Sequence, residues 1–97
     1  MHQKLVEIKK KIVDGKPSIG TWLQIPNSAS AEVLASSNDF DWICIDMEHS
    51  TITFDQMSIL ISIIESKKSV PFVRVGSNNQ LNIKKALDAG ARGVIVP

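Results

Sequence analysis

The sequence lacks several features that would place it in a structural class at once. It has one cysteine, Cys44, among 97 residues. A single cysteine cannot form an internal disulfide, which fits the reducing cytosol, so we expect a cytoplasmic protein. One cysteine and two histidines are too few for a zinc site of the Cys/His kind. The longest apolar run, residues 59–64, is broken by Ser62 and is far too short to cross a bilayer.

The sequence also lacks an excess of charge of either sign. Eleven Lys and Arg residues against ten Asp and Glu residues give a formal net charge of +1. We therefore expect neither a nucleic acid nor a membrane as a partner. The run Lys9-Lys10-Lys11 fits the solvated face of a helix. The N-terminus shows no secretory signal, and neither glycine-rich nucleotide-binding pattern occurs.

What is present is a regular alternation of helix and strand signals. Leu5, Ile8 and Ile12 recur at spacings of three and four, which predicts a helix. Gly15, with Pro17 beyond it, predicts the end of that helix. Four apolar runs with helical patterns between them predict strands at residues 19–25, 41–46, 70–75 and 93–96. This order predicts an α/β fold with a parallel sheet and right-handed helical crossovers.

Capping signals support the helices between these strands. Ser28 is a candidate N-cap of the helix after the first strand, and Asn38 a candidate left-handed residue at its end. Thr53 and Gln56 fit a capping box at the start of the next helix. Gly90 is expected to end the last helix.

Three polar residues lie where a parallel α/β barrel keeps its chemistry, at the carboxyl ends of strands. Asp46 closes the second strand, His49 follows in the next loop, and Arg74 lies near the end of the third strand. A carboxylate near an imidazole can make it a general base, and an arginine can bind a carboxylate and stabilise an enolate. These parts suit proton transfer on a small keto-acid. The structural alternatives are that Asp46 caps its loop, that His49 is an ordinary exposed histidine, and that Arg74 pairs with Asp46.

Five segments form a recognisable pattern: Gly20-Thr21-Trp22 with Pro26, Phe40-Asp41-Trp42, Ile45-Asp46-Met47-Glu48-His49-Ser50, Pro71-Phe72-Val73-Arg74-Val75, and residues 87–97. In these segments the sequence closely resembles the HpcH/HpaI aldolase family. Those proteins are class II, metal-dependent pyruvate aldolases of the phosphoenolpyruvate/pyruvate barrel superfamily. Members include 4-hydroxy-2-oxoheptanedioate aldolase and 2-dehydro-3-deoxyglucarate aldolase.

The resemblance implies a role for each matching residue. His49 matches the family's catalytic base, and Asp46 matches its dyad partner. Arg74 matches the arginine that binds the pyruvyl group and stabilises the enolate. Trp22 matches a position that lines the substrate pocket, although it could simply belong to the core. Asp88 matches an aspartate that approaches a neighbouring subunit's active site, although it could equally pair with a lysine of its own helix.

The resemblance also implies the N-terminal half of a TIM (β/α)8 barrel. A complete barrel takes about 250 residues, so residues 1–97 are expected to form a single partial barrel domain, truncated after the fourth strand. The family uses a divalent metal, Mg²⁺ or Mn²⁺. Its carboxylate ligands follow later strands, so we expect no metal ligand among these residues.

The implied reaction is cleavage of a 4-hydroxy-2-oxo acid to pyruvate and an aldehyde through a metal-stabilised pyruvate enolate. The chain would then be a carbon–carbon lyase, or the N-terminal portion of one, with a keto-acid and an aldehyde as small-molecule partners. A citrate-lyase-type subunit is a weaker option. The alternative of another class is a non-catalytic half-barrel that serves as an assembly module. Four parallel strands leave open edges and an inner face carrying Trp22, Cys44 and Phe72, which predicts a homo-oligomer.

Overall fold

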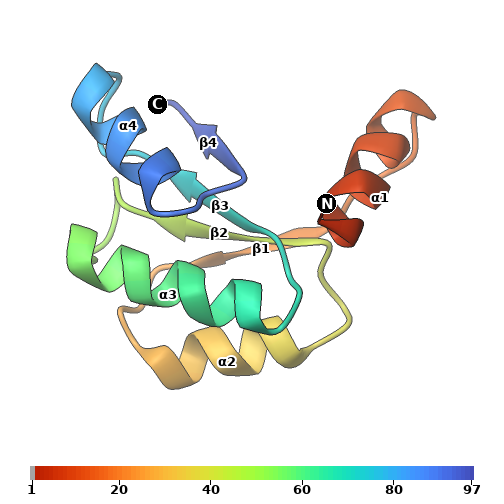
Figure 1. The fold of residues 1–97 in the computed structure, drawn as a ribbon, viewed down its shortest axis with the longest axis horizontal. Helices are drawn as coiled ribbons and strands as arrows, with labels where there is room; N and C mark the ends of the chain where they lie inside the picture. The colour runs from red at the N-terminus through yellow and green to blue at the C-terminus, as the bar shows by residue number, and fades with distance from the viewer. Residues whose placement is uncertain (1) are drawn as a thin grey trace.

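Four parallel strands, hydrogen-bonded in chain order, form the sheet of the computed structural model, which describes residues 2–97 (Figure 1). The strands are β1 (Gly20–Leu23), β2 (Trp42–Asp46), β3 (Pro71–Arg74) and β4 (Gly93–Ile95). The helices are α1 (Gln3–Val13), α2 (Ser28–Ser36), α3 (Phe54–Ser66) and α4 (Gln80–Asp88). The predicted parallel α/β fold is therefore confirmed. No helix within residues 2–97 has the length and apolar character needed to span a membrane.

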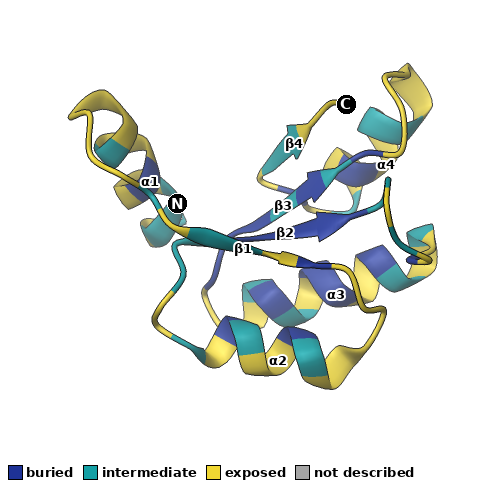
Figure 2. Ribbon diagram, turned by 180° about the vertical axis from the view of Figure 1, so that it is seen from behind, coloured by how far each residue is buried: buried dark blue, intermediate teal, exposed yellow. Residues whose placement is uncertain are grey.

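The two faces of the sheet have different surroundings. Helices α2 and α3 pack on one face, where Ile45 of β2 and Val73 of β3 are fully buried (Figures 1 and 2). This core is completed by a stripe along α3 consisting of Met57, Leu60, Ile61 and Ile64. The central strands β2 and β3 are more deeply buried than the edge strands β1 and β4. The near-continuous apolar character of residues 41–46 thus reflects a central strand whose residues Ile43 to Asp46 are all fully buried between neighbouring strands.

The strand register builds the opposite face in rows. Trp22, Cys44 and Phe72 lie at one level of β1, β2 and β3, as the alternation of side chains predicts. Asp46 and Arg74 are register partners two residues further along β2 and β3, nearer the carboxyl ends of these strands. Because partners in a parallel sheet point to the same face, these two side chains are brought together by the register itself.

Two of the predicted helix ends are wrong. Asn27, not Ser28, is the N-cap of α2: its side-chain oxygen accepts the N–H of Ser30, and Ser28 is the first helical residue. Asn has the same capping ability as Ser, and here it stands one position earlier in extended backbone. Asn38 does not end the helix in the left-handed region. Ser37 ends it in extended conformation, with φ of −73°.

The other capping predictions are confirmed. Thr53 and Gln56 form the expected capping box at the start of α3. Gly15 and Gly90 have φ of +69° and +109°, values at which glycine avoids the steric penalty of a Cβ atom.

Helix α1 stands away from α2 and α3, at the amino ends of the strands (Figure 2). His2 caps it by accepting the N–H of Leu5, and the other ring nitrogen of His2 hydrogen-bonds the carbonyl oxygen of Ser69 at 2.9 Å. Lys11 pairs with Asp41 at 2.9 Å, so the lysine run is not solvated throughout. The carboxyl ends of the strands, at the other end of the sheet, are left free of this helix.

Gly20 allows the indole ring of Trp42 to lie flat over β1. A Cβ atom at Gly20 would fall well inside van der Waals contact with three carbon atoms of that ring. The ring itself is held in place, because its N–H donates to the hydroxyl of Ser18 at 3.0 Å and it packs against Phe72. The clash therefore cannot be relieved by a simple rotation of the indole.

We predict that Gly20→Ala lowers the free energy of unfolding by about 3 kcal/mol, the upper end of typical overpacking penalties. Urea denaturation followed by circular dichroism measures the change. Gly76→Ala is the matched control, because its Cβ would meet no atom closer than 3.5 Å. Equal stability of the two variants would show that the Trp42 ring does not rest on Gly20.

Candidate active site at the carboxyl ends of the strands

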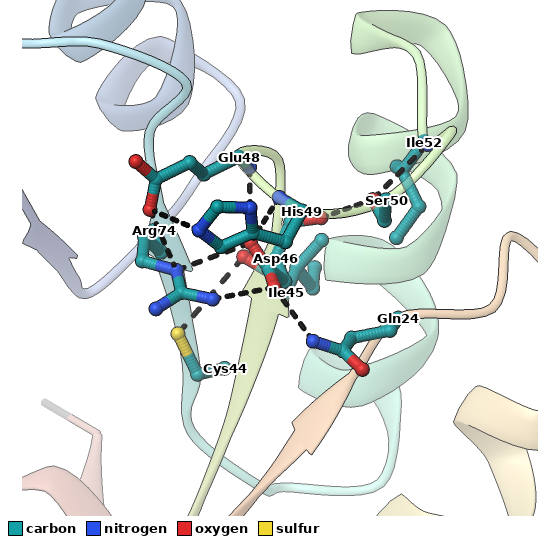
Figure 3. A network of polar contacts seen from close by, with 9 residues as sticks. All are labelled: Gln24, Cys44, Ile45, Asp46, Glu48, His49, Ser50, Ile52 and Arg74. Carbon is teal, nitrogen blue, oxygen red and sulfur yellow. Dashed lines mark hydrogen bonds and ion pairs between the residues drawn. The ribbon is translucent and has the colours of Figure 1, made fainter. Parts of the chain in front are cut away.

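Asp46, the last residue of β2, is the centre of a polar network and is fully buried (Figure 3). Its Oδ1 accepts the main-chain N–H groups of Glu48 at 2.9 Å and His49 at 3.0 Å, which folds the following loop back over the strand end. Its Oδ2 accepts the side-chain amide of Gln24 at 2.8 Å. Asp46 therefore fixes the loop that carries His49, one of the structural roles weighed from the sequence.

Arg74, at the end of β3, approaches the same carboxylate side-on. Its Nε donates to Oδ1 of Asp46 at 3.1 Å and its Nη2 donates to Oδ2 at 2.6 Å. The guanidinium group also stacks on the indole of Trp22, 4.4 Å from the ring centroid. A guanidinium has five N–H donors and Asp46 takes two of them, so three remain on the edge that includes Nη1. Arg74 is thus rigidly held and can still bind a second carboxylate end-on.

The electrostatics keep this pair fully ionised. Burial raises the pKa of Asp46, but hydrogen bonds from Arg74, the His49 main chain and Gln24 outweigh it and hold that pKa well below its usual range. The hydrogen bond to Asp46 raises the pKa of Arg74. Burial raises the pKa of the Cys44 thiol to about 12. Asp46 is therefore ionised at neutral pH, and the buried Cys44 thiol keeps its proton there.

The imidazole of His49 lies on the same rim but does not contact the Asp46 carboxylate. Its side chain is 66% exposed, and Nε2 lies 3.2 Å from Oε1 of Glu48. The same Glu48 oxygen lies 3.5 Å from Nε of Arg74 (Figure 3). The side-chain dyad expected between Asp46 and His49 is absent here, because Asp46 accepts the main-chain N–H of His49 instead. His49 and Arg74 nevertheless face a common carboxylate, so they lie on one side of the sheet.

The remaining predicted site residues have different surroundings. Trp22 is 39% exposed and stacks on Arg74, so it lies beside the polar network rather than in the core. Asp88 ends α4, is exposed, and forms no ion pair with the other side chains of residues 2–97. Lys85, a candidate partner of Asp88, instead places its ammonium group 4.4 Å from the centroid of the Phe54 ring.

Two residues of the network were missed by the sequence interpretation. Gln24 immediately follows β1, two positions after Trp22, so its side chain falls on the same face of the sheet. The two-residue spacing from Trp22 could therefore have predicted that Gln24 lies on the face that carries Asp46 and Arg74. Glu48 belongs to the recognised motif, but no spacing rule shows which neighbours its side chain will choose.

The residues present do not fit a divalent metal site. No group of three His, Cys, Asp or Glu side chains within residues 2–97 is arranged to hold a metal ion. Asp46 is already engaged by five hydrogen bonds, which leaves its carboxylate no free lone pair for a cation. We assign no metal ligand to these residues.

Parallel strands that alternate with helices and carry an ionised network at their carboxyl ends are the arrangement found at the active-site end of α/β barrels. Residues 18–97 match the sequence profile of the HpcH/HpaI aldolase/citrate lyase family. The chain belongs to that family, which confirms the resemblance drawn from the motifs.

Curated relatives agree with this assignment. The chain is 44% identical over 84 residues to a hydroxypyruvate/pyruvate aldolase of Rhizorhabdus wittichii, an alignment covering 87% of the chain and 33% of that protein. It is 39% identical over 89 residues to a 4-hydroxy-2-oxo-heptane-1,7-dioate aldolase of Salmonella dublin, covering 92% of the chain and 34% of the relative. The chain thus spans about a third of the length of these relatives.

Solved structures match the fold as well. A HpcH/HpaI aldolase/citrate lyase family protein from Burkholderia cenocepacia superposes with a TM-score of 0.82 at 34% identity, over 94% of the chain and 36% of that structure. The citrate synthase SbnG superposes with a TM-score of 0.80 at 36% identity, over 93% of the chain and 36% of that structure. The four parallel strands and their helices therefore correspond to part of the barrel in these longer proteins.

Proposed function

We propose that this chain carries the keto-acid-binding and proton-transfer portion of a carbon–carbon lyase, either as an enzyme or as the N-terminal part of one. The reaction is cleavage of a 4-hydroxy-2-oxo acid to pyruvate and an aldehyde, or its reverse. The observation that supports it most is the guanidinium of Arg74, fixed by Asp46 and Trp22 with three N–H donors left for a ligand. The exposed imidazole of His49 stands on the same rim.

Arg74 binds the carboxylate of the keto-acid end-on, and Asp46 holds the guanidinium in place for it. In the cleavage direction, His49 accepts the proton of the C4 hydroxyl group. The C3–C4 bond breaks, the C4 carbon leaves as the aldehyde, and the bonding electron pair forms the enolate of pyruvate. The cation of Arg74 stabilises this negative charge. A proton then returns to C3 and completes the methyl group of pyruvate.

Titration of the ¹⁵N-labelled chain with pyruvate tests the binding step. We expect saturable chemical-shift changes of the Arg74 side-chain and His49 signals, because the remaining N–H donors of Arg74 bind the carboxylate of pyruvate. Pyruvamide is the matched control ligand: it keeps the keto group and lacks the charge, so we expect at least tenfold weaker binding, from the loss of charge-assisted hydrogen bonds. Equal binding of the two ligands, or none of pyruvate, would contradict the proposed role of Arg74.

A non-catalytic assembly module is the second candidate, because β1 and β4 have unpaired edges in the sheet of residues 2–97. Beside β1, exposed apolar side chains that include Ile25 and Val33 line a hollow of about 540 Å³. Such an edge favours association of copies. Under this candidate, sedimentation shows an oligomer, and the chain with Mn²⁺, pyruvate and a simple aldehyde makes no product. A stable monomer, or aldol product from the chain alone, would reject it.

A further inference from the structure

A second group of charged side chains lies at the opposite end of the sheet from the Asp46–Arg74 network. A hollow of about 480 Å³ opens there, between the start of α1, the end of α3 and the segments that precede β3 and β4. A hollow of this volume can hold a small molecule. It is lined by His2, Gln3, Lys4, Glu65, Lys68 and Arg92. None of these residues takes part in the network at the carboxyl ends of the strands.

The single carboxylate that lines this hollow is already paired. Oε1 of Glu65 lies 2.5 Å from Nε of Arg92, and Oε2 lies 3.3 Å from Nε2 of His2. The side chain of His2 is 7% exposed, and its ring is hydrogen-bonded to the N–H of Leu5 and the carbonyl oxygen of Ser69. These contacts fix two walls of the hollow, and Arg92 already balances the charge of Glu65.

The lysines of the hollow have no such partner. Lys4 and Lys68 form no ion pair with any other side chain of residues 2–97. Arg92 donates to Glu65 through Nε, so both of its terminal nitrogens keep their N–H donors for a ligand. The whole chain has a formal net charge of only +1. Three cations around one carboxylate are therefore a local concentration of positive charge, not a share of a general excess.

These donors surround the hollow from three elements. Lys4 belongs to the first turn of α1, Lys68 to the turn after α3, and Arg92 to the segment before β4. Gln3 and Lys4 begin α1, so the positive end of that helix dipole lies beside the same hollow. An anion with oxygen atoms on several sides can accept from all of these donors, whereas a carboxylate presents two oxygens in one plane.

We propose that this hollow binds the phosphate group of a small molecule. The charge of a phosphate monoester, close to −2 at neutral pH, balances the unpaired ammonium groups of Lys4 and Lys68. Its three terminal oxygens accept hydrogen bonds from these two groups and from the terminal nitrogens of Arg92. The site is independent of the proposed keto-acid site, because the two lie at opposite ends of the sheet. A bound phosphate joins α1 to the segments that precede β3 and β4.

Titration of the ¹⁵N-labelled chain with inorganic phosphate, at neutral pH and constant ionic strength, tests the site. We expect saturable chemical-shift changes at Gln3, Lys4, Lys68 and Arg92, with a dissociation constant on the order of 1 mM. A second titration with glycerol 3-phosphate identifies the source of the phosphate group. Tighter binding than that of inorganic phosphate indicates a phosphate ester, and equal or weaker binding indicates free phosphate. Binding of neither probe, or changes confined to Arg74 and its neighbours, would overturn the proposal.

Lysine variants locate the bound phosphate. Lys4→Gln and Lys68→Gln should each weaken phosphate binding about threefold, and together about tenfold, as separate, partly exposed ionic contacts are lost. Lys10→Gln is the matched control, because it removes the same charge from an exposed position in the last turn of α1, outside the hollow. It should leave phosphate binding unchanged. Equal weakening by Lys10→Gln would assign the effect to overall charge and contradict the proposal.

Pyruvate binding, measured in the same lysine variants, separates this site from the proposed keto-acid site. It should stay native-like in Lys4→Gln and Lys68→Gln, because both lysines lie far along the strands from Arg74. A parallel loss of pyruvate and phosphate binding would mean that the hollow binds anions in general, which overturns its assignment to phosphate. Phosphate binding without any pyruvate binding would leave this site standing and reject the keto-acid site alone.

Discussion

Asp46→Asn is expected to lower the free energy of unfolding by about 3 kcal/mol, a typical penalty for breaking one side of a buried ion pair. The substitution keeps the shape of the side chain and removes the charge that faces Arg74. The amide group also brings a donor to a place where Gln24 and Arg74 already supply donors. Urea denaturation measures the loss, and Asp14→Asn, an exposed change at the end of α1, should stay within about 0.5 kcal/mol of native.

The same stabilisation has a defined pH dependence. The folded-state pKa of Asp46 is below its ordinary value of 3.8, so the unfolded chain binds protons first as the pH falls. The contribution of Asp46 is therefore complete above the ordinary pKa and is lost as the pH falls toward the folded-state pKa. The stability difference between native and Asp46→Asn chains should shrink below a pH of about 4. A difference that is constant with pH would show that the Asp46 charge does not act.

Arg74→Ala is expected to weaken pyruvate binding at least tenfold, because two charge-assisted hydrogen bonds to the ligand carboxylate are lost. It also leaves Asp46 buried without its counter-ion, so folding must be checked by circular dichroism. Arg74→Lys keeps the positive charge and loses the planar fork, and we expect intermediate binding. Calorimetric titration gives the dissociation constants.

Arg92→Lys is the matched control for the arginine series, because Arg92 is exposed and pairs with Glu65 outside the rim. Native-like pyruvate binding by this variant, together with a loss in both Arg74 variants, places the anion site at the carboxyl ends of the strands. Equal losses in the Arg74 and Arg92 series would assign binding to general positive charge instead.

The arrangement of strands and helices could be predicted from the sequence because apolar periodicity determines it. The run at residues 41–46 became the buried strand β2, and the capping box at Thr53 marks the start of α3. The same register that pairs β2 with β3 brings Asp46 beside Arg74, so this contact follows from alternation alone. The convergence of His49 on that rim was also foreseen, whereas its catalytic role stays a prediction.

The contacts that were missed depend on competition between similar groups. Asn27 and Ser28 can both cap a helix, and only the backbone conformation decides between them. Asp46 and Glu48 both flank the loop that carries His49, and in the structure the imidazole lies beside Glu48, while Asp46 accepts the main-chain N–H of His49. Sequence spacing does not show how many hydrogen bonds a carboxylate already accepts.

The central claim is that a guanidinium fixed by Asp46 and an imidazole on the same rim together bind a small keto-acid. Isotope-filtered NMR with ¹³C-labelled pyruvate measures this most directly, by recording which protein protons lie next to the bound ligand. We predict contacts of the bound ligand to Trp22, His49 and Arg74. Contacts confined to Lys4, Lys68 and Arg92, which line a separate hollow beside the amino ends of the strands, would contradict this claim.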